Sequence, residues 1–134
     1  MIEKKDSLQP ALRVAIAAAQ EKQAAEITLL DFKGLGAFTD GFLVCTGFSA
    51  PQVDAICDEI EQQLARIGVR LIHREGKAGA EWMLLDFGGF IVHVFTERAR
   101  QYYDLERLWR AARRINFTEP RSPGSASEPA EAEG

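Results

Sequence analysis

The sequence predicts an α+β fold with two layers, in which helices flank a mixed five-stranded sheet. An apolar stripe at helical spacing over residues 53–67 lies between two strand-like segments. A double glycine at 88–89 joins two further apolar segments, which is typical of a hairpin. Along the 134 residues the expected order is α-β-β-α-β-β-β-α, and this length suits one domain with a real core.

The first third of the chain predicts one helix and two paired strands. Apolar residues at helical spacing indicate a helix over residues 7–23, with a polar cap at its start. Residues 27–32 read as a strand, followed by a glycine-containing connection. Residues 42–46 are apolar on both faces, which favours a position inside the sheet. The short connection between the two strands favours antiparallel pairing.

The second helix has the clearest start signal. Ser49 is a good cap, a proline lies in the first turn, and Gln52 occupies the capping-box position. The stripe consists of Val53, Ile56, Ile60, Leu64 and Ile67. Gly68 ends the helix, and residues 69–74 form a strand that completes a β-α-β crossover, so this strand is expected to run parallel to 42–46.

The last third predicts a hairpin and a helix. Residues 82–87 and 90–95 form the hairpin strands, and Thr96 can cap the helical region that follows. Leu105, Leu108, Trp109 and Ala112 form its apolar stripe. After Phe117 the composition changes to small residues, proline and glutamate. The sequence therefore predicts a folded domain over 1–117 and a disordered acidic tail over 118–134.

Charge and composition exclude several classes of function. The net charge is -4, and the segment 118–134 accounts for -3 of it, so residues 1–117 carry no broad basic field for nucleic acid. No apolar run approaches the roughly 20 residues of a membrane span, so no membrane contact is expected. Cys45 and Cys57 lack metal-type spacing and read as buried, reduced thiols, which favours a cytoplasmic protein.

Residues that could support catalysis are few. The turn over 76–79 lacks the strand-to-helix context and the hydroxyl residue of a phosphate-binding loop. His73 and His93 lie in strands and read as structural, although convergence in space stays open. The segment ending at Ser49 is similar to a nucleotidyltransferase opening, but no strand carries the acid-x-acid pair that holds a metal ion. We therefore expect no enzyme, no metal and no cofactor.

Two aromatic residues and three arginines remain as binding candidates. Trp109 belongs to the apolar stripe, so core packing is expected. Trp82 lies where a loop enters a strand, so surface anchoring and burial are both open. Within the predicted helix, Arg107, Arg110 and Arg114 fall on one face. This face is either simply solvated or a contact for RNA phosphate or acidic protein.

Taken together, short motifs in order across residues 11–109 resemble the ribosomal silencing factor (Iojap) family. They are Leu30-Asp31-Phe32, Thr39-Asp40, Cys45-Thr46-Gly47 with Ser49, Glu75-Gly76, Trp82, Leu85-Asp86-Phe87-Gly88, Val92-His93-Val94-Phe95, Arg100, Tyr103, Leu105-Glu106 and Leu108-Trp109. Gly41 stands where the family often has an aromatic residue, which predicts a small surface change.

The resemblance implies a nucleotidyltransferase-like fold without the catalytic carboxylates. It also implies a translational repressor that binds the large ribosomal subunit, chiefly its fourteenth protein, and sterically blocks joining of the small subunit under nutrient limitation. Family members look homodimeric when free. The expected ribosome-binding residues are Glu75, Gly76, Trp82, Asp86, Gly88, Arg100 and Tyr103. Alternatives are a diverged nucleotidyltransferase that uses Ser49, or an adaptor in ribosome assembly.

Overall fold

The computed structural model describes residues 10–32, 34–36 and 39–117. The expected helix start at residue 7 and the expected tail over 118–134 lie outside these ranges. The elements are α1 (Pro10–Glu21), β1 (Ala25–Asp31), β2 (Gly41–Gly47), α2 (Ala50–Arg66), β3 (His73–Glu75), β4 (Trp82–Asp86), β5 (Ile91–Thr96), α3 (Glu97–Tyr103), α4 (Leu105–Leu108) and β6 (Arg113–Asn116).

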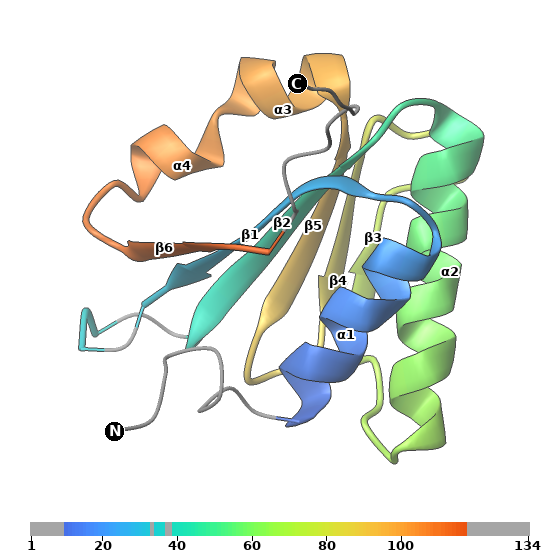
Figure 1. Cartoon of the computed structure of the whole chain (residues 1–134), viewed down its shortest axis with the longest axis horizontal. Coiled ribbons are helices and arrows are strands. Elements are labelled where there is room, and N and C mark those ends of the chain that lie inside the picture. The colour runs from blue at the N-terminus through green and yellow to red at the C-terminus, as the bar shows by residue number, and fades with distance from the viewer. Residues whose placement is uncertain (1–9, 33, 37–38, 118–134) are drawn as a thin grey trace, which may run out of the picture.

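These strands form one mixed sheet in the order β3-β4-β5-β2-β1-β6 (Figure 1). The β2–β5 pair is parallel and every other neighbouring pair is antiparallel. The α+β class, the hairpin of β4 and β5, and the antiparallel pairing of β1 with β2 are therefore confirmed. β3 runs in the same direction as β2, as predicted, but it is shorter than predicted and pairs with β4 at the edge.

The predicted number of strands is wrong, because the described chain has six rather than five. The predicted last helix ends early: Asp104 has φ +49°, which separates α3 from the four residues of α4. The chain then pairs as β6 with β1, where Ile115 lies opposite Leu29 and is buried. Pairing with an otherwise open sheet edge thus outweighs the helical pattern of this segment.

The predicted two-layer arrangement is also wrong, since helices lie on both faces of the sheet (Figure 1). One buried cluster joins α1 and α2 to residues such as Leu43, Leu85 and Val92. The other joins α3 and α4 to the opposite face, through Phe32, Phe42, Phe95 and their neighbours.

The start of α2 follows the predicted capping pattern. Ser49 Oγ accepts a hydrogen bond from Gln52 N at 3.2 Å, and Gln52 Oε1 accepts one from Phe48 N at 2.6 Å. Thr96 caps α3 in the same way, through a bond from Ala99 N at 3.3 Å. Ser49 thus acts as a structural cap of the helix.

Three further expectations concern the two cysteines, Gly41 and the absence of a membrane span. Cys45 and Cys57 are free and buried, as predicted, and burial raises the pKa of each thiol to about 12. The surface change expected at Gly41 is wrong: this residue is buried, and a Cβ there would lie 2.7 Å from the Leu30 carbonyl oxygen. None of the described helices is long and apolar enough to cross a membrane.

Candidate functional site

The register of β3 against β4 defines a sheet face that we call the open face, made of His73, Glu75, Trp82, Leu84 and Asp86. His73 lies opposite Asp86, and its Nε2 is 2.6 Å from Glu75 Oε2. Glu75 lies opposite Leu84, and residues paired across strands point to the same side. Arg74 and Leu85 point to the other side, where Arg74 bonds Glu61 of α2 at 2.8 Å. The open face therefore lies on the side of α3, which packs over β5 and β2.

Trp82 is the aromatic residue of the open face, lies at the start of β4 and is half-buried. Its Nε1 donates a hydrogen bond to His93 Nδ1 at 3.0 Å. Its ring lies 5.1 Å from the ring of Phe95 and 4.4 Å from that of Tyr103, centroid to centroid. The sequence left surface anchoring and burial of Trp82 both open, and the structure combines them. The indole is fixed by contacts with His93, Phe95 and Tyr103, while part of it stays accessible to solvent.

His93 is a structural residue, as predicted. It is 3% exposed, and burial lowers its pKa from the ordinary 6.5 to about 4, so it is neutral at pH 7. Since Nδ1 accepts the bond from Trp82, we assign the ring proton to Nε2. A neutral histidine of this tautomer fixes the orientation of the indole.

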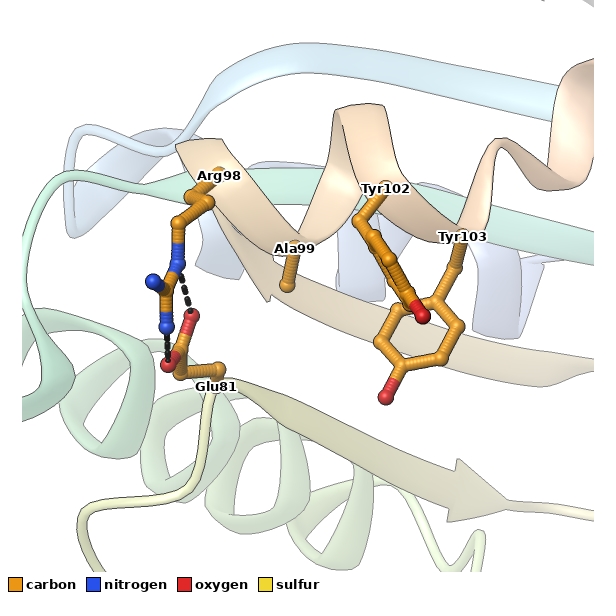
Figure 2. A pocket seen from close by; sticks show the side chains of 5 residues that line it. All are labelled: Glu81, Arg98, Ala99, Tyr102 and Tyr103. Carbon is orange, nitrogen blue, oxygen red and sulfur yellow. Dashed lines mark hydrogen bonds and ion pairs between the residues drawn. The ribbon is translucent and has the colours of Figure 1, made fainter.

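Tyr103 connects the open face to a hollow of about 370 Å³ beside α3. Figure 2 shows Arg98, Tyr102 and Tyr103 extending from α3 toward the side on which Glu81 lies, at the start of β4. Arg98 is ion-paired to Glu81, and its Nε donates to Glu81 Oε1 at 3.2 Å. The result is a shallow site with an aromatic wall and a charged rim.

The backbone at residue 76 lies so close to β4 that only glycine fits there. Its φ is +104°, and a Cβ would lie 2.5 Å from Met83 Sδ and 2.9 Å from the Trp82 carbonyl oxygen. The turn that follows Glu75 is therefore held against the strand that carries Trp82. This contact is internal and keeps Glu75 beside the tryptophan.

Asp86 and Gly88 shape the hairpin. Asp86 Oδ1 accepts a hydrogen bond from Gly88 N at 2.8 Å, a local bond of the kind predicted for this aspartate. Gly88 has φ +92° and is exposed. Both residues lie at the end of β4, so the open face ends in a rigid turn.

Arg100 is separated from the other predicted binding residues, since it is only 9% exposed. Its guanidinium donates to Thr46 Oγ1 at 3.1 Å, to Thr28 Oγ1 at 3.3 Å and to the backbone oxygen of Glu26. It is also ion-paired to Glu106, which is itself largely buried. Arg100 therefore clamps α3 and α4 to β1 and β2.

The three arginines do not share one helical face, because α4 ends at Leu108 and Arg114 lies in β6. Strand pairing still places Arg114 opposite Leu30, whose side chain belongs to the cluster under α3 and α4. All three arginines are exposed. The predicted helical face is therefore wrong: Arg107 and Arg110 line one hollow, and Arg114 lies apart from it in β6.

Sequence reasoning missed two surface residues of this region. Leu84 lies between Trp82 and Asp86 on the open face, and strand alternation alone could have placed it there. Tyr102 is 79% exposed, although its neighbour Tyr103 was selected. Leu108, predicted for the apolar stripe, is 72% exposed, whereas Trp109 packs against Phe32 with ring centroids 4.6 Å apart.

A metal site does not emerge from the described ranges, since no three His, Cys, Asp or Glu residues there are grouped so that they could hold an ion. The open face is instead an arrangement of one fixed indole, a leucine, two carboxylates, an exposed histidine that bonds one of them, and a tyrosine at the border. Such an arrangement suits macromolecular binding, in which a few aromatic anchors dominate the energy.

Comparison with known proteins identifies relatives of this chain. A family model described as "Ribosomal silencing factor during starvation" matches residues 4–134. The ribosomal silencing factor RsfS of Bacillus subtilis is 43% identical over 98 residues, covering 73% of this chain and 83% of that protein. The chloroplastic Iojap protein of Arabidopsis thaliana is 33% identical over 99 residues, which cover 74% of this chain and 41% of that protein.

Two solved structures are also similar to this chain in fold and in sequence. A crystal structure of a protein from Bacillus halodurans superposes with a TM-score of 0.72 at 35% identity, covering 82% of this chain and all (100%) of that one. A crystal structure of a protein from Chromobacterium violaceum gives a TM-score of 0.74 at 31% identity and covers 89% of this chain and 99% of that one.

Proposed function

Because the chain belongs to the ribosomal silencing factor family, we propose that it represses translation by binding the large ribosomal subunit. In this proposal the bound protein blocks joining of the small subunit, and it does so under nutrient limitation. The family name supports a ribosome-associated regulator, and its reference to starvation supports the physiological condition. The action is steric, so it needs affinity and residence time rather than turnover.

The observation that carries the proposal is the open face, which has Trp82 at the start of β4 and beside Tyr103. The indole keeps an accessible part although three aromatic neighbours and a hydrogen bond fix it, so little conformational entropy is lost on binding. A rigid, partly exposed tryptophan beside an exposed apolar or polar rim is typical of a binding hot spot. An interface of standard size would bury about 800 Å² on each partner, which extends beyond the tryptophan to its neighbours.

The charge of the open face fits a basic protein partner. Glu75 on β3 is exposed and is hydrogen-bonded to the exposed His73, and Asp86 at the end of β4 is half-buried. Their carboxylates can pair with lysine or arginine side chains of the fourteenth large-subunit protein, which is the proposed main partner. Gly76 and Gly88 allow the turns at the two ends of β4 to lie close to the open face, and Tyr103 borders it. Arg100 acts indirectly, by holding α3 and α4 on the sheet. We further propose that Arg107, Arg110 and Arg114 contact ribosomal RNA.

Co-sedimentation with purified large subunits tests the site. Trp82→Ala is expected to weaken binding by about 2 kcal/mol or more, a loss of at least roughly thirtyfold in affinity. Ile67→Ala is a matched control, because Ile67 is also an accessible apolar residue but lies at the end of α2 on the other side of the sheet. Circular dichroism checks that both variants stay folded. Equal binding of the two variants would remove Trp82 from the site.

A subunit-joining assay tests the mechanism. The wild-type protein is expected to reduce formation of complete ribosomes in proportion to its occupancy of large subunits, without nucleotide and without further change over time. A protein that binds but leaves joining unaffected would be an assembly adaptor instead. Inhibition that grows with time and requires Mg²⁺ and nucleotide would point to the nucleotidyltransferase alternative. Light scattering of the free protein tests the proposed homodimer separately.

A further inference from the structure

A second hollow, of about 530 Å³, lies between the end of α3 and α4 and is separate from the open face. We call it the arginine hollow, after Arg107 and Arg110, which line it together with Tyr102 and Leu108. Tyr102 and Tyr103 also line the hollow beside Glu81, so the two depressions share one wall. A ligand in the arginine hollow would therefore be next to whatever covers Trp82.

The charge of the arginine hollow is not neutralised internally. Arg74, Arg98 and Arg100 each have a carboxylate partner. By contrast, Arg107 and Arg110 form no ion pair and no side-chain hydrogen bond within the described part of the chain. Asp104 is the single acidic residue of the lining, so the two guanidinium groups leave a net positive charge. The guanidinium donors are free to bind an anion.

An aromatic ring is available beside this charge. Tyr102 is 79% exposed, and its ring meets that of Tyr103 edge to face, with centroids 5.0 Å apart and an angle of 89°. Tyr103 packs in turn against Trp82, which supports the pair from the sheet. The ring of Tyr102 is thus held at its edge while most of its surface faces solvent.

A flat exposed ring next to two unpaired guanidinium groups matches the chemistry of unpaired RNA. Bases that are splayed from a helix stack on tyrosine, and arginine binds the adjacent phosphates. The carboxylates of an acidic peptide would pair with the arginines but offer no flat surface that stacks on the tyrosine ring. The open face carries the opposite charge, at Glu75 and Asp86. A ribosomal surface that offers a basic protein beside RNA complements both regions.

We propose that the arginine hollow binds an unpaired nucleotide of ribosomal RNA when the protein is bound to the large subunit. The base stacks on Tyr102, and Arg107 and Arg110 hold the flanking phosphates, with Arg114 in β6 on the same side of the sheet. This inference rests on the proposed function, because the RNA is that of the subunit whose protein covers the open face.

Titration of large subunits at several potassium chloride concentrations tests the phosphate contacts. The double variant Arg107→Ala, Arg110→Ala is expected to bind about tenfold more weakly near physiological salt. It should also lower the slope of log affinity against log salt by about 1.5, since each phosphate contact contributes about 0.7 to 0.9. The control is Arg66→Ala, Arg70→Ala, which removes two exposed arginines at the end of α2 and beyond it. An unchanged slope in the first variant overturns the inference.

The stacking contact has its own pair of variants. Tyr102→Ala is expected to lower the affinity about tenfold, whereas Tyr102→Phe keeps the ring and should stay within about twofold of the wild type. Ultraviolet crosslinking of the wild-type complex, followed by nuclease and protease digestion, should recover Tyr102 joined to a nucleotide. Recovery of Tyr102 on a ribosomal-protein peptide instead would overturn the inference.

The two proposals fail in different ways. If Trp82→Ala loses subunit binding while the arginine and Tyr102 variants match their controls, the RNA site and the proposed arginine contacts are wrong, and the proposed binding through the open face stands. If the wild-type protein does not sediment with large subunits at any salt concentration, the proposed function itself is wrong.

Discussion

Among single residues, His93 links the interior of the sheet to the open face through its bond to Trp82. Burial holds its pKa in the folded state at about 4, against an ordinary value of 6.5. The unfolded chain therefore binds a proton on this residue more readily than the folded chain below about pH 6.5. Stability is expected to fall as the pH drops from about 6.5 to about 4, by up to about 1.4 kcal/mol per pH unit.

Urea unfolding at pH 7.5 and pH 5.0 measures this effect. The wild type is expected to lose about 2 kcal/mol more between these values than His93→Asn, because the asparagine oxygen can accept the bond from Trp82 without titrating near pH 6. Comparison with this variant removes the contribution of the carboxylates. His73→Gln is the control at the exposed histidine. A loss as small in the wild type as in His93→Asn would contradict the assignment of a buried neutral imidazole.

Comparison of individual residues shows which members of the site could be predicted from the sequence and which could not. The position of Trp82 at the start of a strand marked it as a candidate, whereas Glu75 and Asp86 came from the family resemblance, and the structure places all three on one face. Arg100 could not be distinguished from a surface arginine, because its burial depends on Thr28, Thr46 and Glu106, which are distant along the chain or on the next helix. Contacts of this kind leave no local pattern in the sequence.

At the scale of elements, the turn between β3 and β4 holds Glu75 in place, and two of its glycines can be compared. Both have positive φ, +104° at Gly76 and +87° at Gly79. A Cβ at Gly76 would clash with Met83 and the Trp82 carbonyl, whereas a Cβ at Gly79 meets nothing within 4 Å. Substitution of Gly79 therefore tests the cost of a positive φ alone, whereas substitution of Gly76 adds the cost of a clash with β4.

Gly79→Ala is expected to cost about 1 kcal/mol of stability, the approximate cost of a left-handed alanine. Gly76→Ala should cost about 2 kcal/mol more than that, and it should shift the fluorescence of Trp82, because β4 must move away from the turn. Chemical unfolding measures the stability, and the variant in a Trp109→Phe background gives the emission of Trp82 alone. Equal losses in both variants would mean that the turn does not lie against β4.

Elements whose pattern is local were the most predictable. The cap of α2 and the hairpin of β4 and β5 have signals within a few residues, and both formed as expected. The segment 105–116 has a helical stripe, yet its last residues pair with β1. That pairing depends on an open edge nearly ninety positions away, as in the Leu29–Ile115 pair, and no local propensity encodes it.

For the whole molecule, the order of the sheet explains why sequence reasoning found the members but not the arrangement. β5 inserts between β2 and β4, so the crossover through α2 reaches the edge rather than the neighbouring position. On the face opposite α2, α3 packs mainly over β5 and β2 and reaches β4 only where Tyr103 meets Trp82, so β3 and the rest of β4 form the open face. A five-stranded, two-layer arrangement would have contained the same residues without indicating which face is accessible.

The extent of the folded unit gives the last prediction. Phe117 packs against the core of α1 and α2, and its N–H bonds the Ile27 carbonyl at 2.8 Å, which ties the end of the described chain to β1. Beyond it, residues 118–134 contain no Val, Ile, Leu, Met, Phe, Trp or Tyr. A chain of residues 1–117 is therefore expected to unfold within about 1 °C of the full chain, because no large apolar side chain is removed. A chain of residues 1–112, which lacks β6 and Phe117, should unfold well below both, since it loses the pairing with β1 and the burial of Ile115. Calorimetry of the three chains distinguishes these cases: a marked drop at 1–117 would show that the last segment contributes to the fold, and equal stability at 1–112 would contradict the sixth strand.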